Sequence, residues 1–231
     1  MNLCIINCNR ADIKINKKDL ISILQNTQTF IEPKIELEQY SIDATCAVDL
    51  VFFAGFEFDD IKNKLIFDLG AGTGRLSIAC ALLKAGCVLS IDKDWRALHI
   101  LKKNIKNLNL EQIIFPICAE VKYLEISKLL IPKNLKITTI MNPPFGVQHK
   151  TADRIFLEKA FSFSDVVYSI HLASENVHKF LLKYIKKFNW KVDNVLPFIM
   201  ILEKSFRFHT QKKKRVNVNV YRYLKKIEKN S

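Results

Sequence analysis

The chain has six cysteines but no CxxC pair, and no apolar run in it approaches the about 20 residues that a membrane-spanning helix needs. The cysteines sit mostly within apolar runs, so we expect buried free thiols of a reducing compartment and no metal site. The first residues, MNLCIINC, are too short and too polar in their flanks for a signal peptide. Together, these absences predict a soluble, cytoplasmic protein.

Acidic residues are scarce relative to basic ones. The chain carries 36 lysines and arginines against 23 aspartates and glutamates, which gives a formal net charge of +13 at pH 7. Such a charge attracts polyanions through counterion release and long-range steering, so nucleic acid is the predicted partner. A compositional bias toward lysine, isoleucine and asparagine is the alternative explanation, and the charge alone leaves it open.

The chain shows no internal repeat and no long linker, which predicts one domain for its 231 residues. The segment 16–30 predicts a short helix capped by Asn16, and LEQYSIDATCAVDLVFFAGF predicts a second helix. Helical segments then separate several of five short apolar runs, which indicates parallel strands with crossover helices on both faces. The five runs are KLIFDLG, CVLSIDKD, IIFPICAE, KITTIMN and VVYSIHL.

The end of the chain follows another pattern. Two long strand-like segments, LPFIMILEKSFRFH and VNVNVYRYLKK, flank the basic TQKKKR, which predicts an antiparallel hairpin. The predicted fold is therefore α/β, with a mostly parallel seven-stranded sheet and a C-terminal antiparallel hairpin. This arrangement is typical of Rossmann-like class I methyltransferases.

A glycine-rich loop, DLGAGTG, joins the first predicted strand to a helix, at the edge where open α/β sheets bind ligands. Gly70, Gly72 and Gly74 bring the third glycine one residue earlier than a dinucleotide fingerprint requires, and Arg75 stands at the fingerprint position. The spacing therefore favours S-adenosylmethionine over a nicotinamide dinucleotide. The alternative is an ordinary tight turn.

Three acids follow successive predicted strands. Asp68, just before the glycines, is placed to attract the ammonium of S-adenosylmethionine, and Asp92 is placed to accept hydrogen bonds from its ribose hydroxyls. Glu120, after the third strand, is placed to accept a hydrogen bond from its adenine amino group. The alternatives are a helix cap for Asp92 and a plain surface position for Glu120.

The fourth predicted strand ends in the sequence NPPF. If the side-chain oxygen of Asn142 and the carbonyl of Pro143 each accept one hydrogen of a planar amine, they direct its lone pair at a methyl donor. The rigid Pro143 and Pro144 keep both acceptors in place, and Phe145 offers a face on which a base can stack. The motif is satisfied equally by adenine in RNA, adenine in DNA or a glutamine amide, and an ordinary Pro-Pro turn is its structural alternative.

From Pro33 to Leu224, the chain resembles the methyltransferase-like protein five family of small-subunit ribosomal RNA adenine-N6 methyltransferases and its archaeal homologues. The resemblance rests on LEQY, MNPPFG, VYSIHLASENVHKFL and FRFHTQKKKRVNVNV. It implies that LEQY closes over the methionine end of the cofactor. Ile42 stands where the family usually has threonine, so the hydroxyl contact of that threonine is in question. Thr45 is the nearby hydroxyl that remains as a candidate for this contact. The cofactor-binding residues are predicted to be Gln39, Tyr40, Thr45, Asp68, Gly70, Gly72, Gly74, Asp92, Glu120, Val121 and Asn142, and the catalytic residues Asn142, Pro143, Pro144 and Phe145.

The resemblance also indicates partners. His171 is a candidate RNA contact, with a structural histidine as the alternative, and Lys212, Lys213, Lys214 and Arg215 form a predicted phosphate-binding hairpin tip. A small zinc-binding activator protein is expected to extend the sheet beside the third strand, although core packing explains the apolar IIFPIC equally well.

The predicted function is methyl transfer from S-adenosylmethionine to the N6 amine of an adenosine in small-subunit ribosomal RNA. The alternatives are a glutamine-amide methyltransferase, a DNA adenine methyltransferase and a non-catalytic RNA-binding or assembly factor. The expected organisation is a single domain, 1–231, with a helical extension and cofactor lid at 1–60 and a Rossmann-like core ending in a basic hairpin at 61–231.

Overall fold

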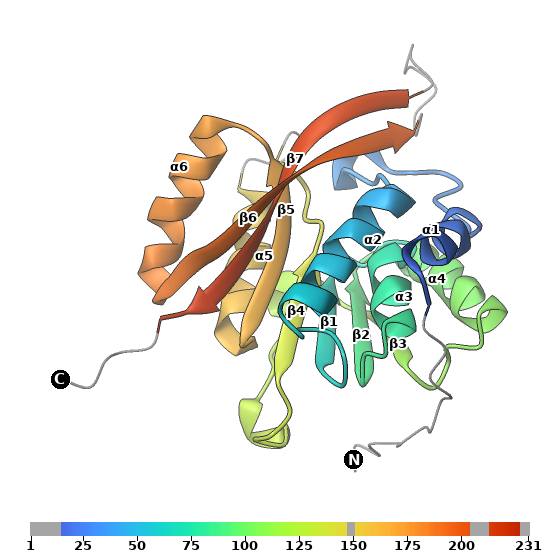
Figure 1. The fold of residues 1–231 in the computed structure, drawn as a ribbon, viewed down its shortest axis with the longest axis horizontal. Coiled ribbons are helices and arrows are strands. Elements are labelled where there is room, and N and C mark those ends of the chain that lie inside the picture. The colour runs from blue at the N-terminus through green and yellow to red at the C-terminus, as the bar shows by residue number, and fades with distance from the viewer. Residues whose placement is uncertain (1–14, 147–150, 204–212, 227–231) are drawn as a thin grey trace.

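The computed structural model describes residues 15–146, 151–203 and 213–226. Within these ranges, seven strands form one sheet in the order β3-β2-β1-β4-β5-β7-β6 (Figure 1). Strands β1 to β5 run parallel, and β7 runs antiparallel to both β5 and β6. The strands are β1 (Leu65–Leu69), β2 (Cys87–Asp92), β3 (Ile114–Cys118), β4 (Ile137–Met141), β5 (Val166–Leu172), β6 (Trp190–Glu203) and β7 (Lys213–Lys225).

Helices cover both faces of the sheet and form two cores. Helices α1 to α4 pack against one face, and α5 and α6 pack against the other (Figure 1). The helices are α1 (Lys17–Gln25), α2 (Ala44–Phe52), α3 (Arg75–Leu82), α4 (Trp95–Asn107), α5 (Ala152–Phe163) and α6 (Glu175–Tyr184). Short helical turns are η1 (Ile35–Leu37), η2 (Phe53–Glu57), η3 (Val121–Tyr123), η4 (Lys128–Leu130) and η5 (Ile185–Phe188).

The continuous apolar character of β1 follows from this two-sided cover. Leu65, Phe67 and Leu69 belong to the core beneath α5 and α6, whereas Ile66 belongs to the core beneath α1 to α4. Because side chains alternate between the two faces of a strand, Asp68 shares the face of Ile66 and meets α3. The sheet, the crossover helices and the terminal hairpin confirm the predicted fold class.

The prediction of the N-terminal helices was right for one and wrong for the other. Helix α1 begins as expected, with the Asn16 side chain accepting from the Asp19 amide at 2.9 Å. The second helix does not start at LEQY but at Ala44, because the Asp43 carboxylate accepts from the Cys46 amide and caps it there. The preceding residues form η1 and a loop, which leaves their side chains free to face a cleft.

The hairpin of β6 and β7 extends well beyond the parallel strands (Figure 1). Near its far end, the Ile201 amide donates to the second oxygen of Asp43 at 2.9 Å. One carboxylate therefore caps α2 and fastens the hairpin beside the loop that precedes α2.

The four described cysteines, Cys46, Cys80, Cys87 and Cys118, are free thiols. Cys46 and Cys80 are buried as expected, but Cys118 is exposed because β3 is an edge strand; Cys4 and Cys8 lie outside the described residues. No helix in the described ranges is long and apolar enough to cross a membrane. Within the same ranges, no three His, Cys, Asp or Glu side chains form a group that could hold a metal ion.

Candidate active site

A cleft of about 360 Å³ opens at the carboxyl ends of β1, β2 and β4. Three segments line it: the loop between η1 and α2, the glycine loop after β1, and the first turns of α5. Open parallel sheets bind their ligands at this edge, because loops from neighbouring strands converge there. The cleft is therefore the candidate active site.

The glycine loop forms a floor that side chains would fill. Gly72 and Gly74 have φ of +54° and +92°, a region that residues with a Cβ rarely adopt. A Cβ on Gly74 would lie 2.0 Å from the Leu101 side chain, and one on Gly72 would lie 3.0 Å from the Phe30 ring. The close packing of this loop therefore requires glycine at both positions, and other residues could not replace them without strain.

Asp92 ends β2 and lines the cleft. Its two carboxylate oxygens accept from the Gly72 amide at 2.8 Å and the Asp94 amide at 2.9 Å. The cap of α4 is Asp94, whose side chain accepts from the Arg96 amide, so Asp92 is not a helix cap. Burial raises the pKa of Asp92, and the two amides oppose this shift by stabilising its charge. Its remaining lone pairs are free to accept from a ligand.

Asp68 lies at the base of the cleft and is only 1% exposed. Burial raises its pKa to about 7, the hydrogen bonds from Ser77 oppose this shift, and the charge of Asp92 adds to it. The Ser77 hydroxyl donates to Asp68 at 2.5 Å and also contacts the Ser90 hydroxyl. A buried carboxylate in this state gains most from a cationic ligand, which replaces the lost water around its charge.

The loop that contains Gln39 and Tyr40 is fastened to the core. The Gln39 side chain donates to Asp94 at 2.8 Å and accepts from the Lys34 amide at 2.8 Å. Arg75, the residue after the glycines, donates to the Ile42 carbonyl at 2.7 Å. Gln39 thus lines the cleft and at the same time holds the loop in place.

Tyr40 and Asn142 present polar atoms that lack partners in the described protein. The hydroxyl of Tyr40 and the side-chain oxygen of Asn142 are buried and accept no hydrogen bond from any described residue. Both residues line the cleft. Because an unsatisfied buried polar atom is costly, these two atoms indicate that a ligand with hydrogen-bond donors belongs there.

The rest of the NPPF motif shapes the wall of the cleft. Pro144 lines it and Pro143 is buried beside it. Phe145 is partly buried and lies outside the lining residues, with its ring centre 5.4 Å from that of Tyr40. The two aromatic rings therefore support each other at the junction of the loop and the motif.

Ten of the eleven predicted cofactor-binding residues line the cleft, and Thr45 does not. Glu120 and Val121, at the start of η3, line the cleft. Thr45 is exposed on the first turn of α2, and the structure places it outside the lining of the cleft, unlike the prediction. The reason is the helix start at Ala44, which turns Thr45 outward, while Ile42 lines the cleft instead.

His171 is buried, with 3% of its surface exposed. Its Nε2 atom lies 2.8 Å from the Ser169 hydroxyl and its Nδ1 atom 3.9 Å from Asp153, and burial lowers its pKa to about 3. This burial favours the structural alternative over a direct RNA contact. In the predicted hairpin tip, Arg215 is exposed on β7, Lys213 and Lys214 belong to the same strand, and Lys212 lies outside the described residues.

Sequence reasoning missed several residues that build the site. Phe30 and Phe156 cover Gly72 and Gly70, and both line the cleft. Asp94 and Arg75 hold the loop around Gln39 from positions far away in the sequence. Only Asp94 had a local signal, an acid directly before the apolar pattern of a helix.

These residues fit S-adenosylmethionine. Asp68 and Asp92 place two carboxylates at the cleft, which suit a ligand with an ammonium and ribose hydroxyls, and the glycine loop leaves room for close approach of a ligand. Glu120 and Val121 line the same cleft, after the strand next to that of Asp92. The side-chain oxygen of Asn142, without a partner in the described part of the chain, lies at the same cleft.

Known proteins show the same sequence pattern. The TRM5/TYW2 methyltransferase domain family matches residues 59–131. The rRNA N(6)-adenosine-methyltransferase METTL5 of Danio rerio is 35% identical over 209 residues, which cover 89% of this chain and 97% of the relative. An uncharacterized protein of Methanocaldococcus jannaschii is 34% identical over 212 residues, 90% of this chain and 94% of that protein.

A solved structure shows the same fold. The crystal structure of the proposed RNA methyltransferase PH1948 from Pyrococcus horikoshii superimposes with a TM-score of 0.82 at 36% identity, and covers 92% of this chain and 99% of that one. Fold, cleft and relatives together define a Rossmann-like, S-adenosylmethionine-dependent class I methyltransferase. Within this class, the chain belongs to the METTL5 family of rRNA N6-adenosine methyltransferases. The predictions of fold and cofactor are confirmed.

Proposed function

We propose that this protein transfers a methyl group from S-adenosylmethionine to the N6 amine of an adenosine in small-subunit ribosomal RNA. The observation that carries the proposal is the side-chain oxygen of Asn142, which is buried at the cleft beside the glycine loop and has no hydrogen-bond partner among the residues that the structure describes. That oxygen is an acceptor for one hydrogen of a planar amine, and the carbonyl of Pro143 is the second acceptor. The family assignment favours adenosine in RNA as the amine.

The chemistry assigned to the chain is mainly orientation. When bound, S-adenosylmethionine supplies an electrophilic methyl group on its sulfonium. Adenine N6 is a weak nucleophile, because its lone pair is delocalised into the ring. Two acceptors that hold both of its hydrogens direct the lone pair out of the ring plane, which stabilises the transition state more than the ground state. Tyr40 at the cleft, with Phe145 packed against it, supplies aromatic surface beside the base, and Pro143 and Pro144 keep the acceptors fixed.

The test is Asn142→Ala, with Asn142→Asp as the matched variant that keeps an oxygen acceptor. Loss of one preorganised contact of this kind lowers turnover about 10²- to 10³-fold, so single-turnover methyl transfer should fall by that factor. Affinities for the cofactor and the RNA should stay within about twofold, since the contacts of Asp92 and the glycine loop remain. Asn142→Asp should retain more activity than Asn142→Ala.

The substrate is identified in the same assay. A transcript of the source organism's small-subunit rRNA, a double-stranded DNA of the same sequence and a glutamine-containing peptide are offered with radiolabelled cofactor. Methylated adenosine in the RNA alone supports the proposal, whereas label in the DNA or the peptide assigns one of the rival functions. If folded Asn142→Ala methylates RNA at the wild-type rate, the motif is only a turn.

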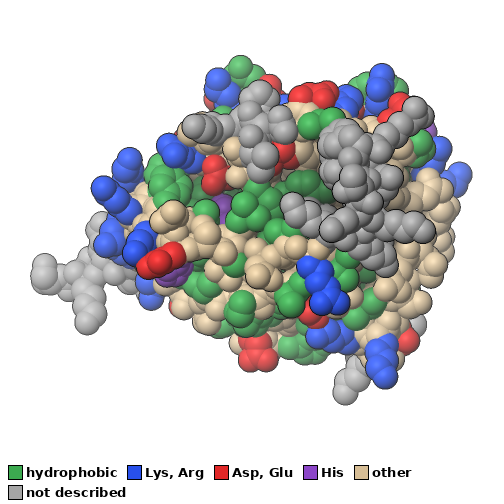
Figure 2. Space-filling model, turned by 90° about the horizontal axis from the view of Figure 1, so that it is seen from above, with side chains coloured by type: hydrophobic (Ala, Val, Ile, Leu, Met, Phe, Trp, Pro, Cys, Tyr) green, Lys and Arg blue, Asp and Glu red, His purple; other side chains and the backbone are tan. Residues whose placement is uncertain are grey.

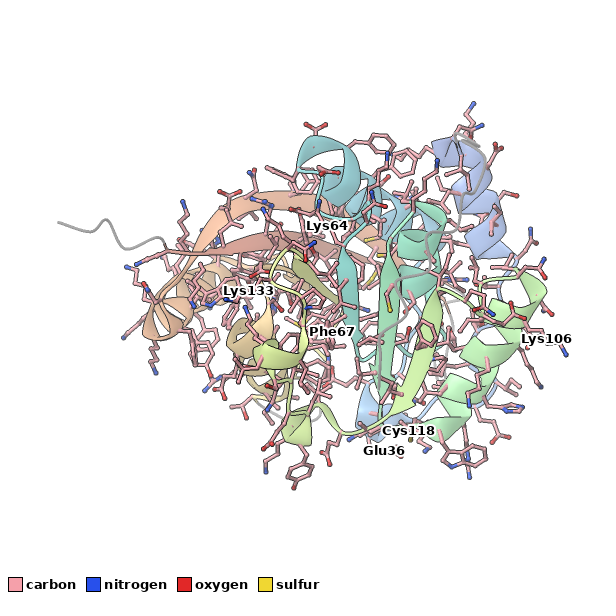
Figure 3. The ribbon with its side chains drawn as sticks, turned by 90° about the horizontal axis from the view of Figure 1, so that it is seen from below. Glu36, Lys64, Phe67, Lys106, Cys118 and Lys133 are labelled. Carbon is pink, nitrogen blue, oxygen red and sulfur yellow. The ribbon has the colours of Figure 1, made fainter. Side chains whose placement is uncertain are left out.

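We also propose a small zinc-binding activator protein as a partner at the edge of the sheet. Phe115 and Ile117 point to the same side of the edge strand β3 and are 44% and 36% exposed. Figure 3 shows Cys118 at the end of this strand. An uncovered apolar edge favours pairing with another chain. Phe115→Asp together with Ile117→Asp should abolish a complex with the purified activator on size-exclusion chromatography, and a persistent complex would move the partner elsewhere.

The remaining parts of the proposal concern organisation and location. Phe30 and the loop 36–42 line the cleft together with the glycine loop, which supports a single domain whose first 60 residues act as the cofactor lid. A cytoplasmic location fits a ribosomal RNA substrate, and fractionation of cells that express a tagged chain tests it.

A further inference from the structure

A group of lysines on the outer side of α6 has no role in the site described above. Lys183, Lys186 and Lys187 are exposed at the end of α6 and in η5, at the three- and four-residue spacing that keeps side chains on one helix face. Lys225, the last residue of β7, and Lys226 lie beside them, because the Lys226 amide donates to the carbonyl of Asn189, which follows η5. These five exposed lysines are called the α6 surface.

The positive charge of the α6 surface is not neutralised by the neighbouring acids. Within the described ranges, no ion pair joins any of its lysines to a carboxylate. The acids on adjoining elements already have partners: Glu175 with Lys179, Asp193 with Arg222, and Glu158 with the hydroxyl of Tyr184. Figure 2 shows lysine and arginine side chains gathered at the side of the molecule where α6 lies. Five clustered cations without an ion pair in the described part of the chain favour a polyanion.

The α6 surface connects with the cleft through a row of cations on aromatic rings. Ile155, on α5, lines the cleft, and its neighbour Arg154 lies over the Phe180 ring at 4.6 Å and near the Tyr184 ring at 5.7 Å. The ammonium of Lys187 lies 5.3 Å from the same Tyr184 ring. Arg154, next to a lining residue of the cleft, and Lys187, in η5, therefore meet at one ring, whose hydroxyl donates to Glu158, and α6 joins the two regions over about 15 Å.

We propose that the α6 surface binds the phosphate backbone of the RNA on the flank of the adenosine that enters the cleft. The inference rests on the proposed function, because the cleft would fix one nucleotide and the lysines would hold the chain that continues from it. Phosphate contacts of this kind set orientation and register without reading bases. An RNA long enough to leave the cleft and follow α6 gains from the surface, and a very short RNA does not.

The experiment compares two variants with equal loss of charge. The test variant carries Lys183→Gln, Lys186→Gln and Lys187→Gln. The control carries Lys102→Gln, Lys103→Gln and Lys106→Gln, three exposed lysines of α4 on the opposite side of the molecule, where Figure 3 labels Lys106. The probes are the small-subunit rRNA transcript and a six-nucleotide RNA with a single adenosine. Filter binding is measured from 50 to 300 mM KCl, and methyl transfer is measured on the same samples.

For the long transcript, log affinity falls with log salt, and each lost phosphate contact makes this fall less steep by about 0.7 to 0.9 of a slope unit. The slope of the test variant should therefore be flatter than that of the wild type by about 2 to 3 units. Its KM for the transcript should rise while its kcat stays unchanged, and binding of the six-nucleotide RNA should not change. The control variant should keep the wild-type slope.

Three results separate the inference from the proposed function. A wild-type salt slope in the test variant overturns RNA binding by the α6 surface. An equally reduced slope in the test and control variants also overturns it, because net charge alone would then explain the change. If the wild-type protein methylates no adenosine but the slopes differ as expected, the α6 surface stands and the proposed function fails.

Discussion

The buried Asp68 makes cofactor binding depend on pH. Its pKa of about 7 arises first from burial, with Ser77 opposing the shift and Asp92 adding to it. Only the ionised carboxylate attracts an ammonium, so the apparent affinity scales with the ionised fraction. This fraction is about one half at pH 7 and about one tenth at pH 6, whereas an α-amino group with a pKa of about 7.7 to 8.0 stays protonated over this range. The affinity for S-adenosylmethionine should therefore fall about fivefold from pH 7 to pH 6.

Isothermal titration calorimetry at pH 6.0, 6.5 and 7.0 measures this loss, with Asp68→Asn as the matched control. The variant should bind more weakly at pH 7, and its affinity should change less with pH. Because the pKa of Asp92 is also raised, the difference between the two profiles isolates Asp68. A wild-type affinity that is constant between pH 6 and 7, or an identical slope in Asp68→Asn, refutes the role of Asp68.

The same carboxylate affects stability without ligand. Its folded-state pKa lies above the unfolded value of about 3.9, so the folded protein holds the proton more tightly. The free energy of unfolding contributed by Asp68 should therefore decrease as the pH rises from about 4 to about 7 and then level off. Denaturant titrations give the free energy of unfolding at each pH. This free energy should depend on pH differently in the wild type and in Asp68→Asn, and the same pH dependence in both would contradict the burial argument.

Two further predictions concern Phe145 of the NPPF motif and Gly74 of the glycine loop. Phe145→Ala should weaken capture of the target base by the about 1 to 3 kcal/mol that a stacking platform contributes, measured as RNA affinity, and Phe145→Tyr should restore most of it; equal losses in both would remove stacking as the cause. Gly74→Ala should destabilise the fold by at least about 1 to 3 kcal/mol in a urea titration, because its Cβ would lie 2.0 Å from Leu101 at a φ of +92°. Gly55→Ala, whose Cβ would meet nothing closer than 3.6 Å, is the control, and equal stability of the two variants contradicts the packing argument.

The sequence by itself determined the features that depend on near neighbours. The apolar runs of β1 to β5 and the helical spacing between them fixed the fold class, because side-chain periodicity is a local property. The glycine spacing and the NPPF motif located two walls of the cleft for the same reason. Asp68, Asp92 and Asn142 were found because they follow strands whose carboxyl ends must meet at one edge of a parallel sheet.

The tertiary structure decided what depends on contacts between distant segments. The Gln39 side chain donates to Asp94, which is 55 positions away in the sequence. Gln39, predicted to bind the cofactor, therefore also fastens the loop before α2 to the core. Thr45 faces outward because Asp43, tied to the hairpin through Ile201, starts the helix at Ala44. The burial of His171 and the pKa of Asp68 likewise follow from what packs around them, since desolvation is set by neighbours in space and leaves no mark on the local sequence.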